Sequence, residues 1–144
     1  MSLDTSLLSA VNGIVLVVGT GIAQVAAQAT LSWTMKMIPH PQGSRHPTFY
    51  MLAHSVTAVL VLMAGHMLQV VFWAAFFFFV IGELGSFRSA LYFSLANFTT
   101  LGAHHLGLSD VHRIVGTLES AAGMLMFGWS TALLVKVVQR TDRD

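Results

Sequence analysis

The stretch NFTTLGAHH, residues 97–105, lies within a short segment between two long apolar runs, and its position decides how the chain is arranged. A piece rich in small and aromatic side chains, SFRSALYFSLANF (residues 86–98), leads into it. As a helix this piece would be ~20 Å long, which is short of the ~30 Å hydrocarbon core of a bilayer. It cannot cross a membrane, so its surroundings determine whether it lies outside one or enters and returns.

The composition is that of an integral membrane protein. Of the 144 residues, 55% are hydrophobic and 9% are charged, and the mean hydropathy is +0.72. A soluble domain typically carries about 25% charged residues. The chain has no cysteine, which excludes disulfides and thiolate metal sites. A formal net charge of +1 argues against nucleic acid as a partner.

Three apolar runs are long enough to cross a bilayer, for which about 20 residues suffice. They cover residues 7–33, 50–82 and 111–138. The first run is too long for the apolar core of a signal peptide and no Lys or Arg precedes it, so we expect it to be a retained helix. Prolines within residues 36–48 preclude a regular helix between the first two runs. We expect the aromatic block at residues 76–79 to face lipid.

The distribution of Lys and Arg predicts the orientation. Basic residues lie in the first loop and at the C-terminus, namely Lys36, Arg45, Lys136, Arg140 and Arg143. The positive-inside rule then places both regions in the cytoplasm, with the N-terminus and residues 83–110 outside a plasma or inner membrane. Both flanking spans must end on that side, so residues 86–98 would enter the membrane and return. Irregular backbone at such depth must be covered by protein or line a water-filled cavity, which favours a pore.

The sequence SALYFSLANFTTLG (residues 89–102) resembles the pore helix and the start of the selectivity filter in the potassium channel superfamily, in its two-helix pore module. The resemblance implies an all-α membrane protein with three transmembrane helices and a re-entrant pore helix and filter loop, assembled as a tetramer. Its parts would be an outer helix over residues 50–82, a pore helix over 86–98, a filter over 99–104 and an inner helix over 111–138.

The same resemblance divides the chain into an additional N-terminal helix with its cytoplasmic loop, residues 1–48, and a channel-like pore module, residues 49–144. It also implies that Gly123 or Gly128 acts as a hinge of the inner helix. We expect the chain to lie in a lipid bilayer and to form homo-oligomers.

The inner half of the stretch supplies what a filter needs. Such a filter replaces the water shell of an ion with rings of carbonyl oxygens. Its residues here would be Thr99, Thr100, Leu101, Gly102 and Ala103. Gly102 can take a left-handed conformation that aims its carbonyl at the axis. The end of the pore helix would turn its negative dipole toward the cavity and favour a cation. We expect a permeating potassium or sodium ion and no cofactor.

The outer half departs from the family, which usually continues with Tyr-Gly-Asp. Ala103 lacks the aromatic ring that braces the filter. His104 stands where a second glycine is expected, and a non-glycine residue held left-handed costs roughly 1–2 kcal/mol. His105 replaces a carboxylate that would concentrate cations. The sequence therefore predicts a weakly selective cation pore whose outer half is an open vestibule.

Histidines and one acid are the remaining candidate site residues. In a tetramer His104 and His105 would form rings at the outer mouth, with His112 nearby. Three interpretations of these histidines are open. They are solvated loop residues, or they form a pH gate that uses the histidine pKa near 6.5. Alternatively, they bind zinc or copper, which would then block the pore. Glu119, about two turns into the last span, is either functional or a hydrogen-bonded carboxyl that braces the pore helix. Its expected partners are Arg88, Arg113 or a nearby histidine.

Other polar residues in the spans have structural interpretations. Gln24 and Gln28 are expected to bond across helices, and His54 and His66 to pack or hydrogen-bond within the bundle. No nucleotide-binding loop, metalloprotease motif or catalytic set is present, so we expect no enzyme activity.

Three functions are compatible with these features. The first is a cation channel subunit. The second is a non-conducting accessory subunit with a degenerate pore. The third is a metal or proton transporter that uses the histidines and Glu119 within the membrane. The Thr-Thr-Leu-Gly core favours the channel over the transporter, and the Ala-His-His half is the main argument for the accessory subunit.

Overall fold

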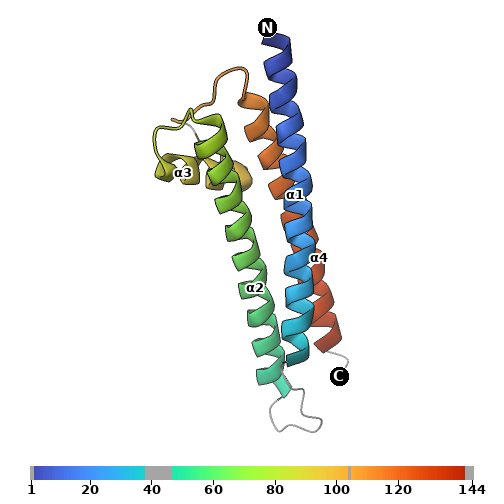
Figure 1. Ribbon diagram of the computed structural model, residues 1–144. Helices are drawn as coiled ribbons and strands as arrows, with labels where there is room; N and C mark the ends of the chain where they lie inside the picture. The colour runs from blue at the N-terminus through green and yellow to red at the C-terminus, as the bar shows by residue number, and fades with distance from the viewer. Residues whose placement is uncertain (1, 38–46, 104, 142–144) are drawn as a thin grey trace.

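The computed structural model describes residues 2–37, 47–103 and 105–141. Its elements in chain order are α1 (Ser2–Met37), α2 (Pro47–Phe76), the π-helical turn η1 (Phe77–Ile81), α3 (Phe87–Phe98) and α4 (Arg113–Thr141) (Figure 1). Three stretches are long and apolar enough to cross a membrane, namely Val11–Met37, Leu52–Ile81 and Arg113–Gln139. The predicted all-α membrane fold with three spans and one short helix is confirmed.

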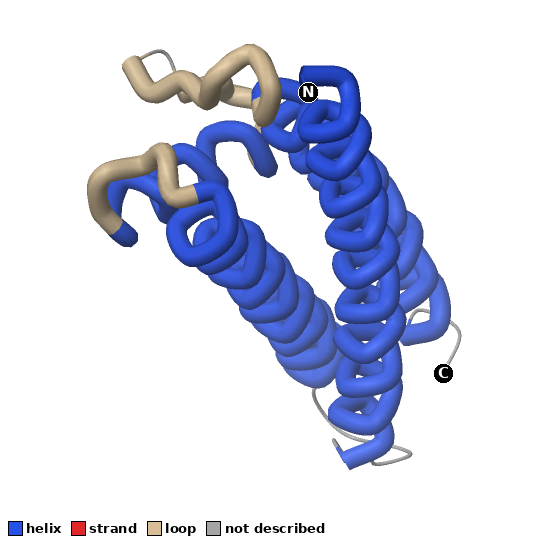
Figure 2. The backbone as a smooth tube through the Cα atoms, turned by 45° about the horizontal axis from the view of Figure 1, so that its top comes forward, coloured by secondary structure: helices blue, strands red, loops and turns tan. Residues whose placement is uncertain are grey.

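The three long helices lie side by side, and the short α3 packs against α2 and α4 near one end of the bundle (Figures 1 and 2). The N-terminus is at this end, and the end of α4 is at the other. Both α2 and α4 therefore have one end beside α3, as a helix that enters and returns requires. The additional helix α1 contacts both α2 and α4, so it is an integral part of the bundle.

Local sequence signals explain where the helices begin and end. Pro47 opens α2, at a position where its missing N–H leaves no intrahelical bond unmade. Gly82 ends η1 with a left-handed φ of 70°, and its N–H donates to the Phe77 carbonyl. Ser86 caps α3, because its hydroxyl accepts a hydrogen bond from the Ser89 N–H.

The expectation that residues 76–79 face lipid is wrong for Phe77. This side chain is fully buried, and its ring meets Phe93 edge-on at 5.0 Å. Phe79, by contrast, is 75% exposed. The physical reason is helical geometry: four consecutive residues point in four directions, so an aromatic run always directs one ring toward the bundle.

The end of α3 reaches deep along α4. Phe98, its last residue, lies against Gly123, which is ten residues beyond Arg113 at the start of α4. Ten residues of helix measure ~15 Å, about half the thickness of a hydrocarbon core. A Cβ atom at Gly123 would overlap the Phe98 carbonyl oxygen, so this approach requires a glycine. The hinge role of Gly123 and Gly128 stays a prediction beside this packing role.

We expect Gly123→Ala to lower the thermal unfolding midpoint of the detergent-solubilised protein. The added methyl group would push α3 away from α4, and overpacking of this kind costs about 1–3 kcal/mol. Gly21→Ala in α1 is the matched control, since a side chain there meets open space. It should be neutral or raise the midpoint, because alanine favours a helix over glycine by ~1 kcal/mol. Equal midpoints for the two variants would contradict the close contact of Phe98 with Gly123.

Candidate functional site

The stretch predicted to form the filter, residues 99–103, begins where α3 ends. Its backbone amides turn back onto the last carbonyls of the helix. The donor and acceptor pairs are Thr99 with Leu95 (3.1 Å), Thr100 with Asn97 (2.8 Å) and Gly102 with Ala96 (3.0 Å). A helix end leaves such carbonyls without intrahelical partners, so the stretch itself caps α3.

Two residues of this stretch have left-handed backbone. Gly102 has a φ of 78°, as the sequence predicts, and Thr100 has a φ of 60°. A β-branched residue in this region is unusual and stores roughly 1–3 kcal/mol of strain. Strain of this kind persists where the surroundings enforce it and is concentrated at functional sites. Between them, Leu101 is 75% exposed on the single chain.

One face of α4 packs against α3 through residues spaced by three and four positions. Gly116 lies against the Phe93 ring, Glu119 meets Ser94, and Gly123 meets Phe98. This spacing puts the three α4 residues in one stripe along the helix. The stripe therefore fixes how far α3 enters the bundle and where the following residues begin.

Glu119 is the polar member of this stripe and is completely buried. Its Oε1 atom lies 2.5 Å from Ser94 Oγ, and Ser94 Oγ lies 2.9 Å from the backbone oxygen of Val70 in α2. The Ser94 hydroxyl is thus within donating reach of both oxygens, and Glu119 Oε2 has no hydrogen-bond partner among the described residues. No cation pairs with Glu119 in the described part of the chain, and a carboxyl buried without one is stable there as the neutral acid, whose proton can be shared with Ser94. It joins α4, α3 and α2 as the predicted brace of the short helix.

The predicted partners of Glu119 differ from the one observed. Arg113 pairs with Asp110 at 2.6 Å, and Arg88 is exposed. Both cations lie near or beyond the ends of the spans, where water solvates them, whereas Glu119 is held within the bundle. Ser94 is its partner, because a neutral carboxyl needs an acceptor rather than a cation.

A second polar cluster ties the two ends of the segment between α2 and α4 together. Glu83 accepts hydrogen bonds from the N–H and the hydroxyl of Ser109, both at 2.6 Å. His112 Nδ1 lies 2.6 Å from Glu83 Oε1. We refer to Glu83, Ser109 and His112 as the outer clasp. It closes the base of the loop that carries α3 and the filter stretch.

The outer clasp sets the protonation of its acid. Partial burial acts to raise the pKa of the Glu83 carboxyl. The hydrogen bonds from Ser109 and the contact with His112 outweigh this effect and hold the pKa below its usual range. Glu83 is therefore ionised at neutral pH and binds the ends of α2 and α4 that lie beside α3 to each other.

The predicted outer-mouth histidines do not share one environment. His112 belongs to the outer clasp, and the His105 ring stacks on Tyr92 with an interplanar angle of 4° and centroids 6.5 Å apart. His104 lies outside the described residues. Among the residues with assigned positions, no three His, Asp or Glu side chains gather where they could hold a metal ion.

A buried polar circuit joins the three spanning helices. Gln69 Nε2 donates to Gln24 Oε1 at 3.1 Å, Gln24 Nε2 donates to Ser130 Oγ at 2.9 Å, and Ser130 Oγ lies 3.0 Å from His66 Nε2. All four side chains are buried. This confirms that Gln24 bonds across helices and that His66 is a hydrogen-bonded helix residue. We refer to these four residues as the polar circuit.

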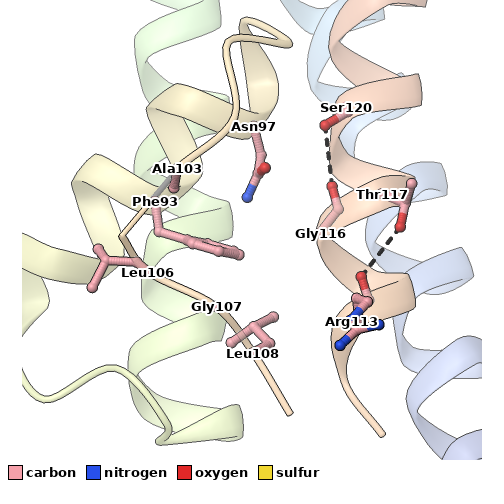
Figure 3. A pocket seen from close by; sticks show the side chains of 10 residues that line it. All are labelled: Phe93, Asn97, Ala103, Leu106, Gly107, Leu108, Arg113, Gly116, Thr117 and Ser120. Atoms are coloured by element: carbon pink, nitrogen blue, oxygen red, sulfur yellow. Dashed lines mark hydrogen bonds between the residues drawn. The ribbon is translucent and has the colours of Figure 1, made fainter. Parts of the chain in front are cut away.

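An open hollow of about 320 Å³ lies between α3, the loop after the filter stretch and the first turns of α4 (Figure 3). The amide of Asn97 points into it from α3, and its Nδ2 atom has no hydrogen-bond partner among the described residues. Thr117 and Ser120 line the opposite wall, where their hydroxyls bond to carbonyls of α4 itself. The hollow is thus of mixed polarity and lies directly behind the filter stretch.

Five polar residues of these clusters were not singled out from the sequence. They are Gln69, Glu83, Ser94, Ser109 and Ser130. Ser94 and Ser130 are short polar side chains within apolar helices, a pattern that is compatible with bonding to the helix's own carbonyls as well as to a neighbour. Only the packing of the helices shows which partner each one takes.

We expect Glu119→Gln to retain most of the stability of the protein in thermal unfolding, because an amide N–H can donate to Ser94 as the neutral carboxyl does. Ser94→Ala should cost about 1–3 kcal/mol, because it leaves the buried Glu119 proton without an acceptor. If Glu119→Gln were as destabilising as Ser94→Ala, the carboxyl would be ionised rather than neutral.

The outer clasp should make stability depend on pH. Because the folded pKa of Glu83 lies below its ordinary value, its contribution is fully present above about pH 4.3 and is lost as the pH falls through the folded value. Thermal midpoints of the wild type and Glu83→Gln should therefore differ at pH 7 and converge as the pH falls through the folded pKa of Glu83. A difference that stays constant over this range would show that the acid contributes through its shape alone.

Comparison with known proteins places these features in a family. Residues 66–140, just over half of the chain, match a family model described as ion channel, of the two-transmembrane potassium-channel type. The match includes the last third of α2, the turn η1, all of α3, the filter stretch and nearly all of α4. No curated protein and no solved structure matches the chain. With its three membrane-spanning helices, the chain is an integral membrane protein that belongs to the ion channel family of the potassium channel superfamily.

Proposed function

We propose that the chain is a subunit of a weakly selective cation channel, in which residues 99–103 of four copies surround a central pore. The observation that carries this proposal is the exposure of Thr99, Thr100 and Leu101 at the end of a helix that stops about halfway through the bundle. Exposed irregular backbone at this depth cannot face lipid, since lipid offers no partner to the polar groups that the hydrogen bonds within the stretch leave unpaired. A water-filled axis or neighbouring copies must cover them.

The surface of α4 supports the same assembly. Ala121, Met124, Leu125, Gly128 and Ala132 of α4 are exposed on the single chain and recur at helical spacing. Small and apolar residues let the helices of neighbouring copies approach closely. In a tetramer this face would meet the other copies or line the cavity below the filter. Each chain then supplies only a quarter of the pore, so a short chain is long enough to build its share.

The chemistry of the stretch favours a monovalent cation, potassium or sodium. Carbonyl rings and the Thr100 hydroxyl offer oxygen atoms in place of water. Ala103 is half-buried and has no ring to brace the outer half, so discrimination between the two ions is weak. Protonation of His105, which is exposed at the same end, would add positive charge near the mouth and reduce cation entry. We place the N-terminus outside and the C-terminus in the cytoplasm of a plasma or inner membrane.

The two alternatives make different use of the same residues. A transporter would need histidines that converge within one chain, whereas His66, His105 and His112 lie in three separate clusters. The transporter alternative therefore has no specific support. A non-conducting accessory subunit is an outcome of the flux experiment that follows.

We expect purified protein in liposomes to conduct potassium and sodium at comparable rates at pH 7.5, and to conduct less at pH 5.5. Gly102→Asp should abolish flux, because it puts a side chain on a residue with a φ of 78° within the filter. Gly85→Asp is the matched control, since this exposed glycine lies outside the filter and a side chain there meets open space.

The fall at pH 5.5 should be smaller in His105→Gln. Flux that persists in Gly102→Asp would show that ions do not pass through this stretch. No flux from folded, oligomeric wild-type protein would favour the accessory subunit instead.

A further inference from the structure

We propose that the additional helix α1 positions the inner end of the filter through the polar circuit, with Gln24, Ser130 and His66 as positioning residues. The proposal rests on the proposed function, since it assigns them to the same filter stretch. It gives α1 a part in ion permeation, although the matched family region begins only at residue 66.

The first step is the direction of the hydrogen bonds in the polar circuit. Gln24 uses its oxygen to accept from Gln69 and its nitrogen to donate to Ser130. Ser130 has one proton, and the neighbouring acceptor within reach is His66 Nε2 at 3.0 Å. With Nε2 of His66 as the acceptor, the bonds run one way, from α2 through α1 and α4 back to α2. The bond at Nε2 holds the His66 ring from this side, while His66 Nδ1 and Gln69 Oε1 have no hydrogen-bond partner among the described residues.

The second step leads from His66 to the end of α3. The His66 ring lies 4.8 Å from the Phe127 ring and 5.9 Å from the Phe98 ring, between centroids. Phe98 and Phe127 also pack edge-on at 5.6 Å. The three rings form one cluster, in which the oriented histidine is one wall of the space that Phe98 occupies. Phe98 is fully buried, so its ring has no other place to go.

The third step leads from Phe98 to the filter. Phe98 is the last residue of α3, its carbonyl lies against Gly123, and Thr99 and Thr100 follow directly. A shift of the Phe98 ring must therefore move the first carbonyls of the filter stretch. Apolar contacts alone could hold α1 in the bundle, as Leu31 does with α2 and α4 residues in a second core cluster. A buried glutamine also fixes how α1 is rotated against its neighbours, because its polar atoms are stable within a membrane only when they meet their hydrogen-bond partners.

The experiment compares Gln24→Leu with Gln28→Leu in the full-length protein in lipid bilayers. Both remove an amide from α1, one turn apart, but no hydrogen bond of Gln28 is described within the polar circuit. Ser130→Ala breaks the circuit from α4, and Ser130→Thr keeps the hydroxyl. Two readouts are taken: amide hydrogen exchange of peptides that cover residues 96–103, and the potassium-to-sodium flux ratio.

We expect Gln24→Leu and Ser130→Ala to accelerate exchange at residues 99–103 at least threefold and to change the flux ratio at least twofold. Gln28→Leu and Ser130→Thr should match the wild type in both readouts. Unchanged exchange at 99–103 overturns the proposal, as does acceleration spread evenly over all helices, which marks simple destabilisation. An unchanged flux ratio in a conducting channel also overturns it. A wild type that conducts nothing sinks the proposed function, while the exchange result still decides the positioning role.

Discussion

The approach of the α3 end to α4 is the contact on which the rest of the molecule depends. A chain that reverses direction within a membrane must satisfy its backbone without help from lipid. Here the reversal is possible because Gly123 lets the Phe98 carbonyl come close and the amides of residues 99–102 cap the helix end. Glu119 then locks the middle of α3 to its neighbours without introducing a charge.

Two polar clusters hold this arrangement from opposite sides, and they differ in kind. The outer clasp is half-exposed and ionic, so salt and pH act on it directly. The polar circuit is buried and uncharged, and its strength comes from the absence of water to compete for its donors and acceptors. The loop between α2 and α4 is therefore closed at its base by charge and supported at its tip by oriented amides and hydroxyls.

Much of the fold could be predicted from the sequence, because span length, proline positions and the half-length helix each follow from bilayer dimensions. The left-handed Gly102 was also within reach of the sequence, since a filter-like Thr-Thr-x-Gly core requires it. The contacts that individual side chains make with neighbouring helices could not be predicted in this way. Glu119 was expected to meet an arginine or a nearby histidine, yet it meets Ser94, and Phe77 was expected to face lipid, yet it lies in the core. Both outcomes depend on how two helices are rotated about their axes, and runs of apolar residues with few polar markers leave that rotation undetermined.

The polar circuit also has a consequence for synthesis. Gln24 and Ser130 are 106 positions apart, so the first helix enters the membrane long before its partner on the last helix exists. Until α4 arrives, the Gln24 amide nitrogen has to be satisfied by water, by the insertion machinery or by another chain. The bundle thus becomes a sealed unit only when the final span is in place, and a chain cut short before Ser130 would present an unpaired amide inside the bilayer.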